Sequence, residues 1–295
     1  MSKSLFLTTL AVIAAASGIF TQANAQAPAN AISGVFSIAK DKQVYFSKGN
    51  LQYTPSTETY TFAEHQWDLL AADNTPTEKI DRFRWGTGDD PMRSSGDYYT
   101  FIDWGINPIE GDAPNTWFTM SKAEWSYVLF RRPNARELYS VAFIDTIYGM
   151  VLVPDSWTSP EGVSFKPFYK NQNKYTFEQW QIMEDNGAVF LPTSYGKNYR
   201  STSPYWTTTW PSTVTPPGGL IYLLSISGCS INLDYYCGGE SRHYTRLVRD
   251  VKNVSTGADV QVEPQNATSR KLLRNGQVLI ERGGKTYSLT GVEVE

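Results

Sequence analysis

The sequence contains few of the residues from which metal and thiol centres are built. It has two histidines, His65 and His243, and two cysteines, Cys229 and Cys237, in 295 residues. The cysteines and His243 follow the spacing C-x7-C-x5-H, which matches none of the usual zinc ligand sets. The sequence therefore predicts no metal site built on cysteine and histidine.

An excess of basic residues is also missing. The chain has 26 Lys and Arg residues against 29 Asp and Glu residues, which gives a net charge of −3 at pH 7. Binding to nucleic acid depends on neutralising phosphates with Lys and Arg, and binding to an anionic membrane surface depends on a polybasic cluster. Neither pattern occurs, so we expect no nucleic acid partner.

Beyond residue 25 there is no apolar run long enough to cross a bilayer. Residues 1–25, in contrast, have the pattern of a signal peptide, because Lys3 precedes an apolar stretch at 5–20 and Ala23-Asn24-Ala25 forms an A-x-A cleavage site. An uncleaved signal anchor is the alternative. We predict an exported protein, extracellular, at the cell surface or in the periplasm, with no membrane span after cleavage.

The two cysteines lie in the segment SGCSINLDYYCGG. In an exported protein an even number of cysteines favours a disulfide, here between Cys229 and Cys237 across a short loop. Two reduced thiols are the alternative, because spacing alone does not give the geometry that a disulfide needs. The sequence leaves both states open.

Two segments have the pattern of capped helices. Ser121 with Glu124, and Thr176 with Gln179, have the spacing of a capping box, in which each side chain bonds the other residue's backbone N–H. Apolar residues follow at helical spacing, and they are Trp125, Val128 and Leu129 in the first segment and Trp180, Ile182 and Met183 in the second. Pro133 should end the first helix, and Asn186-Gly187 the second.

Several other segments have the pattern of strands. Residues 33–53 alternate apolar and polar side chains around 47–50, which predicts an N-terminal hairpin with its turn there. Residues 63–70 predict a helical turn or two. Residues 243–250 predict one closing strand, on which Arg246 and Arg249 mark the polar side rather than a ligand contact. Trp206 lies in an apolar strand and is expected in the core.

Residues 73–117 show little periodicity and many Gly, Asp, Pro and Asn residues, which predicts a long surface segment. Its clustered carboxylates could hold Ca²⁺, an ion that prefers oxygen ligands. They are Asp89, Asp90, Asp97, Asp103, Glu110 and Asp112. A solvated acidic loop without metal is the alternative that we favour, because no D-x-D-x-D-G loop is present.

A series of segments in fixed order resembles a known family. The segments are VYFSKGNLQY, FAEHQW, RFRWGTG, WFTMSKAEW, GMVLVPDSW, YTFEQWQIMEDNGAVFLP, PYWTTTW and RLVRD. Across residues 33–250 this order is similar to that of the exported Bacteroidetes proteins named for the Fibrobacter succinogenes major paralogous domain. Its last part, a strand with tryptophan followed by an RLVRD-type strand, also resembles the formylglycine-generating enzyme superfamily, which has a variant of the C-type lectin fold.

The resemblance implies an α+β, C-type lectin-like domain with two helices and small twisted antiparallel sheets, which we place at residues 33–252. The polar, aperiodic residues 253–269 predict a linker. Residues 270–295 predict a small β tail, because the turn signals Asn275-Gly276 and Gly283-Gly284 separate short alternating strands. This tail resembles short C-terminal segments of exported Bacteroidetes proteins, some of which act as sorting or anchoring signals.

The likeness to lectin-like folds implies an adhesion or carbohydrate-binding protein that recognises glycan or a surface protein through its loops, without catalysis. Aromatic side chains offer contact area with a polar tip, and Asn, Asp and Arg add directional hydrogen bonds. The candidate ligand-binding residues are Tyr199, Arg200, Trp210, Asn232, Asp234, Tyr235, Tyr236, Arg242 and His243. Calcium-dependent lectins carry motifs that are missing here, so we expect no cofactor.

Two other functions stay open. Formylglycine-generating enzymes use a pair of closely spaced cysteines, and the resemblance would assign that oxidase role to Cys229 and Cys237. The surrounding residues supply no clear basic or metal environment that would activate these thiols. A structural subunit of the cell surface or of a fimbria is the third function, and it would differ from a lectin in its partner rather than in its fold.

Overall fold

The computed structural model describes residues 27–70, 78–94, 100–168, 173–193, 203–211, 220–227 and 230–251, together with four C-terminal strands. The predicted signal peptide at 1–25 and the predicted linker at 253–269 lie outside the described residues. The chain divides into two compact units, Met1–Val254 and Ser255–Glu295. We describe each unit by itself.

The first unit is a mixed α+β structure, which confirms the predicted class. Its described residues form two α-helices, α1 (Lys122–Phe130) and α2 (Phe177–Asp185), and several small antiparallel or mixed sheets, none of which closes into a barrel. Two 3₁₀ turns, η1 (Trp104–Ile106) and η2 (Ala135–Glu137), join the sheets. None of the described helices is long and apolar enough to cross a membrane.

The described residues of the first unit form four sheets. One has the order β1-β2-β15-β6, with β1 (Phe36–Ala39), β2 (Lys42–Phe46), β15 (Leu247–Asp250) and β6 (Phe118–Thr119). The second is β10-β8-β7-β9, with β10 (Val189–Pro192), β8 (Ile147–Leu152), β7 (Tyr139–Ile144) and β9 (Asn173–Tyr175). The third is β13-β12-β11-β14-β5, with β13 (Ser230–Gly238), β12 (Leu220–Ser227), β11 (Ser203–Trp206), β14 (His243–Tyr244) and β5 (Arg82–Phe83). The fourth pairs β3 (Leu51–Thr54) with β4 (Thr59–Phe62).

Both predicted helices begin where the sequence indicates. The Ser121 side chain accepts from the N–H of Glu124 and the Glu124 carboxylate accepts from the N–H of Ser121, and Thr176 and Gln179 repeat this box. Gly187, with φ 88°, follows α2 and adopts the left-handed backbone that commonly ends a helix. One predicted contact is wrong, because Ile182 is an exposed side chain of α2.

The predicted N-terminal hairpin is wrong in its strand pairing. Strands β2 and β3 flank the expected turn at 47–50 but do not pair with each other. Instead β1 pairs with β2, and β3 pairs with β4. The helical turn predicted at 63–70 is also absent, because this described stretch consists of bends and turns.

The predicted closing strand is divided between two sheets. Strand β14 pairs with β11 and β5, whereas β15 lies between β2 and β6. The chain crosses from one sheet to the other at Thr245 and Arg246, and both residues are buried. Arg246 and Arg249 therefore lie in the interior, and the prediction that they mark a polar side is wrong.

A buried polar network surrounds Arg246. Its guanidinium donates to Gln66 Oε1 at 2.5 Å and to Asn50 Oδ1 at 3.4 Å, and Asn50 donates to the Tyr205 hydroxyl. Burial lowers the pKa of Arg246 to about 10. Buried charges normally need hydrogen-bonding partners, and here they come from segments far away along the chain.

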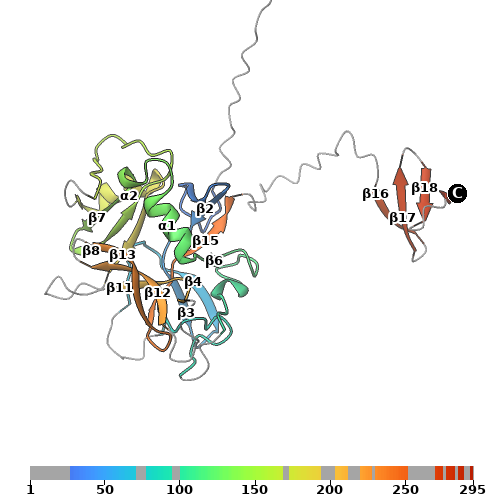
Figure 1. The fold of residues 1–295 in the computed structure, drawn as a ribbon, viewed down its shortest axis with the longest axis horizontal. Coiled ribbons are helices and arrows are strands. Elements are labelled where there is room, and N and C mark those ends of the chain that lie inside the picture. Colours follow the sequence, from blue (N-terminus) through green and yellow to red (C-terminus); the bar gives the residue numbers. More distant parts are fainter. Residues whose placement is uncertain are drawn as a thin grey trace, which may run out of the picture. The chain divides into compact units, whose positions relative to one another are not determined.

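Aromatic side chains fill the interior between these sheets. Helix α1 packs Trp125, Val128 and Leu129 against residues of β1, β2, β8 and β12, and Figure 1 shows α1 (green) between the β2–β15 pair and strand β12. A second cluster joins Trp206 to β3, β4, β5 and β12, and a third surrounds Trp180 of α2.

The segment at 73–117, predicted as a long surface segment with embedded aromatic residues, lies on the surface only in part. Phe83, Trp85, Trp104 and Trp117 are each at most 2% exposed and belong to the second core cluster. Irregular backbone hides the period of these residues, so the sequence pattern does not mark them as buried.

The second unit is a small antiparallel sheet. Its strands are β16 (Arg270–Arg274), β17 (Gln277–Arg282), β18 (Lys285–Ser288) and β19 (Glu293–Val294), each paired with the next along the chain. The two predicted turns, Asn275-Gly276 and Gly283-Gly284, fall between these strands but lie outside the described residues.

Candidate functional site

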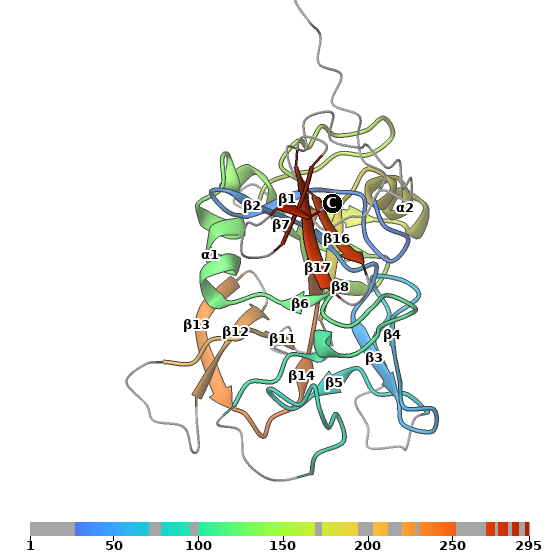
Figure 2. The same cartoon turned by 90° about the vertical axis from the view of Figure 1, so that its right-hand side faces the viewer.

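The predicted ligand-binding residues that the structure describes lie on the five-stranded sheet or in the segments that flank its strands. Strand β13 forms its edge, with β12 and β11 beside it, and Figure 2 shows these strands side by side next to α1. One face of β12, with Leu224 and Ile226, packs in the α1 cluster, and the other, with Ile221 and Leu223, packs in the Trp206 cluster. Among the described side chains of this sheet, those that are exposed belong to the edge strand β13.

A bulge in β13 directs one carboxylate toward α1. Leu223 pairs with Tyr235 and Ser225 pairs with Asn232, so Leu233 and Asp234 together lie opposite the single residue Leu224. Such an extra residue changes the direction of the side chains on the bulged strand. Asp234 Oδ1 lies 2.6 Å from the Lys122 ammonium group at the start of α1.

Lys122 connects this carboxylate to an aromatic pair. Its ammonium nitrogen lies 3.6 Å from the centre of the Tyr222 ring, a cation–π contact. The Tyr222 ring in turn meets the Tyr236 ring edge-on, with centres 6.3 Å apart. We call Lys122, Tyr222, Asp234 and Tyr236 the edge cluster.

Trp210 lies next to the edge cluster along the backbone. The carbonyl of its neighbour Thr209 accepts from the N–H of Tyr222, and the Thr209 hydroxyl accepts from the N–H of Lys122. The Trp210 ring is 41% exposed and rests edge-on against the buried Trp85, with centres 5.9 Å apart. An exposed tryptophan held by a buried one offers a fixed apolar surface.

The other predicted residues do not join the edge cluster. Tyr235 pairs with Leu223 and therefore points to the opposite face of the strand from Tyr236. Asn232 is exposed, and its side chain accepts from the N–H of Asp234 at 2.6 Å. Arg242 is exposed in the turn before β14. Tyr199 and Arg200 lie outside the described residues.

His243 lies inside the sheet rather than on the binding surface. Its ring meets Trp206 with centres 4.7 Å apart, and its Nε2 lies 3.0 Å from Cys237 Sγ. Burial, helped by the charge of Arg82, lowers the pKa of His243 to about 4. Burial raises the pKa of Cys237 to about 11, and the carboxylate of Glu240 acts in the same direction. At neutral pH the pair is therefore a neutral imidazole beside a neutral thiol.

The structure has Cys237 as a free thiol, which agrees with the reduced alternative and not with a disulfide between Cys229 and Cys237. Cys229 lies outside the described residues, but it directly precedes Ser230, the first residue of β13. Seven extended residues then lead to Cys237 and span roughly 23 Å at about 3.3 Å per residue. The extended strand therefore separates Ser230 from Cys237 by much more than the roughly 7 Å that a disulfide allows between Cα atoms.

Cys237 should react slowly with alkylating reagents. A thiol with a pKa near 11 holds roughly 300-fold less thiolate at neutral pH than an ordinary cysteine with a pKa near 8.5. In a Cys229→Ser variant, which keeps Cys237 as its single thiol, we expect iodoacetamide labelling of the folded protein to be slower than labelling in urea by about that factor. Labelling at the unfolded rate would contradict the neutral Cys237–His243 pair.

The carboxylates proposed for Ca²⁺ are held by different partners. Asp89 and Asp90 contact Arg93, Asp103 accepts from Thr119, Glu110 pairs with Lys48, and Asp112 pairs with Arg249. Asp97 lies outside the described residues. Among the residues that the structure describes, no group of three or more His, Cys, Asp or Glu side chains is arranged to hold a metal ion.

Two residues of the edge cluster escaped the sequence analysis. Lys122 lies in the first turn of α1 and Tyr222 in the apolar strand β12, so neither residue has a local sequence signal for binding. Comparison of the chain with known proteins gives no match among family models, among curated proteins or among solved structures. The family resemblance of the sequence therefore stays a prediction.

Proposed function

We propose that this chain is an exported, non-catalytic protein that binds glycan through Trp210 and the edge cluster. The observation that carries the proposal is the set of exposed aromatic rings at this sheet end, in a protein whose other tryptophans are largely buried. Trp210 and Tyr236 are 41% and 49% exposed, and both rest against a second aromatic ring.

The chemistry of this surface suits a sugar. Rigid aromatic rings stack on the C–H faces of sugar rings, and their polar tips stay in water. Lys122 and Asp234 lie beside the rings and form an ion pair, so they offer donors and an acceptor to hydroxyl groups without a net charge. A neutral, hydroxyl-rich ligand fits this combination better than an ionic one.

Removal of either exposed ring should weaken glycan binding. On a glycan array probed with the mature chain, residues 26–295, we expect Trp210→Ala and Tyr236→Ala each to weaken binding roughly 10-fold, since one aromatic contact contributes about that much. Phe130→Ala is the matched control, because Phe130 is 48% exposed but lies at the far end of α1. It should leave binding unchanged.

The alternative functions predict other results for the same mature chain. Strand β13 is a nine-residue edge of its sheet, and an edge strand can pair with a strand of another chain. The absence of any glycan signal, together with self-association of the mature chain, would favour a structural subunit. Equal loss of glycan binding in Phe130→Ala and Trp210→Ala would reject the proposed surface.

A further inference from the structure

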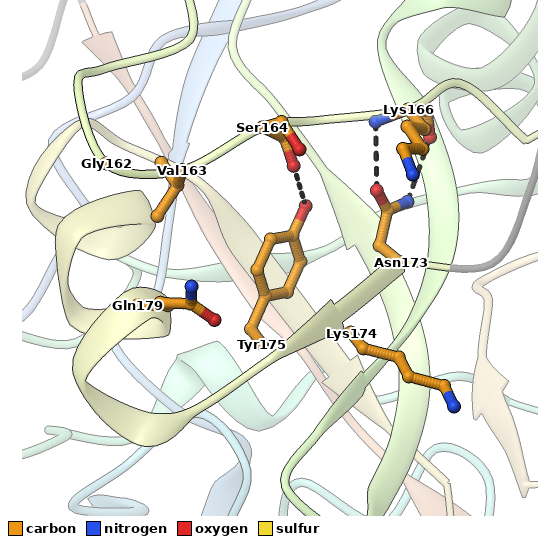
Figure 3. A pocket seen from close by; sticks show the side chains of 8 residues that line it. All are labelled: Gly162, Val163, Ser164, Lys166, Asn173, Lys174, Tyr175 and Gln179. Carbon is orange, nitrogen blue, oxygen red and sulfur yellow. Dashed lines mark hydrogen bonds between the residues drawn. The ribbon is translucent and has the colours of Figure 1, made fainter.

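A hollow lies beside α2 in the first unit. It has a volume of about 490 Å³, within the range of small-molecule sites. One wall is the loop 162–166, and the other is β9 with the first turn of α2 (Figure 3). Its lining residues are Gly162, Val163, Ser164, Lys166, Asn173, Lys174, Tyr175 and Gln179. We call it the α2 pocket.

Two buried side chains of β9 fix the loop wall. The Asn173 amide accepts from the N–H of Lys166 and donates to its carbonyl, both at 2.9 Å, and the Tyr175 hydroxyl donates to the carbonyl of Ser164 at 3.0 Å. Figure 3 shows these bonds bridging from strand to loop. The pocket is therefore shaped before any ligand arrives.

The charge in the α2 pocket is not balanced. Lys166 and Lys174 are part of its lining, which includes no carboxylate. Elsewhere, Lys42, Lys48 and Lys122 each pair with a carboxylate. No described residue forms an ion pair with Lys166 or Lys174, so both ammonium groups are available to an anion.

Another hollow provides a contrast. Its volume is about 580 Å³, and Lys40 and Lys42 line it together with Asp41 and Asp250. There the two positive charges face two negative ones, and no preference for an anion results. The described lining of the α2 pocket, in contrast, includes two lysines and no carboxylate.

Gln179 adds a neutral donor to the α2 pocket. Its side-chain oxygen accepts from the N–H of Thr176 in the capping box, which leaves its amide N–H groups for a ligand. In Figure 3 the Gln179 side chain points toward the Tyr175 ring. The lining of the α2 pocket thus includes two lysines, an amide and the hydroxyl group of Ser164.

We infer that the α2 pocket binds a sugar that carries a carboxylate group. The ammonium groups supply charge-assisted hydrogen bonds to the carboxylate, and the amide and hydroxyl groups suit the sugar's own hydroxyls. This inference rests on the proposed function, since it assumes that glycan is the ligand class. It goes further by assigning acidic sugars to the α2 pocket, which shares no residue with the neutral edge cluster.

Calorimetry of the mature chain with paired sugars tests this assignment. The pairs are 3′-sialyllactose with lactose, and trigalacturonic acid with its methyl ester, and a sulfated disaccharide is a third probe. We expect at least one acidic sugar to bind about 10-fold more tightly than its neutral partner, and the K166M/K174M variant to lose that preference. Lys40→Met, in the charge-balanced hollow, is the matched control and should keep it.

The outcomes separate the inference from the proposed function. Neutral glycans that bind through Trp210, without any preference for acidic sugars, would overturn the α2 pocket assignment alone. Loss of the preference for acidic sugars in Lys40→Met to the same extent as in K166M/K174M would overturn it as well. Binding of the sulfated disaccharide, without binding of either carboxylate sugar, would do the same. Failure of every glycan to bind would reject both.

Discussion

Replacement of Arg132 with alanine should lower the free energy of unfolding by about 3–5 kcal/mol, the loss expected when one partner of a buried ion pair is removed. The Arg132 guanidinium is fully enclosed and lies 2.9 Å from Asp155. It also donates to the carbonyl groups of Val128, Leu138 and Val153 at 2.8–3.2 Å. Burial lowers the pKa of Arg132, and Asp155 opposes that shift.

The effect of Arg132 reaches beyond the pair. Asp155 Oδ2 accepts from both the N–H and the hydroxyl of Ser37 in β1, so one carboxylate holds β1 and the guanidinium together. Alanine would leave three buried carbonyl groups without their donor, and each such loss costs free energy. Urea unfolding followed by tryptophan fluorescence measures the change.

Arg93 provides the matched control. It pairs with Asp89 at 2.8 Å on the surface, and such exposed pairs contribute at most about 1 kcal/mol. Arg93→Ala should therefore shift the urea midpoint much less than Arg132→Ala. Equal shifts in the two variants would mean that the enclosed guanidinium does not hold this part of the fold together.

The Asp81→Asn and His243→Gln variants should change the pH dependence of stability in opposite directions. Burial raises the pKa of Asp81 from 3.8 to about 6, against the hydrogen bond from the Leu70 N–H at 2.7 Å. Between about pH 4 and 6 the folded state therefore holds more protons at Asp81 than the unfolded state. This contribution to stability falls as the pH rises through that window.

The contribution of His243 has the opposite sign. Burial lowers its pKa from 6.5 to about 4, so between these values the folded state binds fewer protons than the unfolded chain. Stability from this residue therefore rises with pH and is lost on acidification. Each group changes the slope by at most about 1.4 kcal/mol per pH unit, and in the natural chain the two slopes largely cancel.

Unfolding free energies measured from pH 4 to 6.5 separate the two groups. Asp81→Asn leaves the His243 term, so its stability should increase with pH across the window. His243→Gln leaves the Asp81 term, so its stability should decrease. Parallel curves for both variants and the natural chain would show that neither group titrates as its burial requires.

Local signals explain which parts of the fold the sequence predicted. A capping box involves residues three apart, so the starts of α1 and α2 are visible in the chain itself. Strand pairing has no such short signal. Strands β2 and β3 are neighbours in sequence, but β2 pairs with β1 and β15, which the alternation of side chains does not indicate.

Distant partners explain the errors at the arginines and in the candidate site. The sequence around Arg246 is typical of a surface residue, because its acceptor, Gln66, lies 180 residues earlier in the chain. In the same way, Lys122 reaches Asp234 across 112 residues, and only the folded sheet brings them together. Trp210 and Tyr236, two of the predicted ligand contacts, are exposed in the structure, and their role in binding stays a prediction.

The position of β15 has a consequence for the order of events during synthesis. Its residues Val248 and Asp250 lie opposite Phe46 and Val44, so the middle of this sheet needs both ends of the first unit. Contacts between residues so far apart form slowly, because a long loop must close first. A nascent chain that has not yet been made as far as residue 250 cannot complete this sheet. We expect the sheet to remain unformed until that residue has been added.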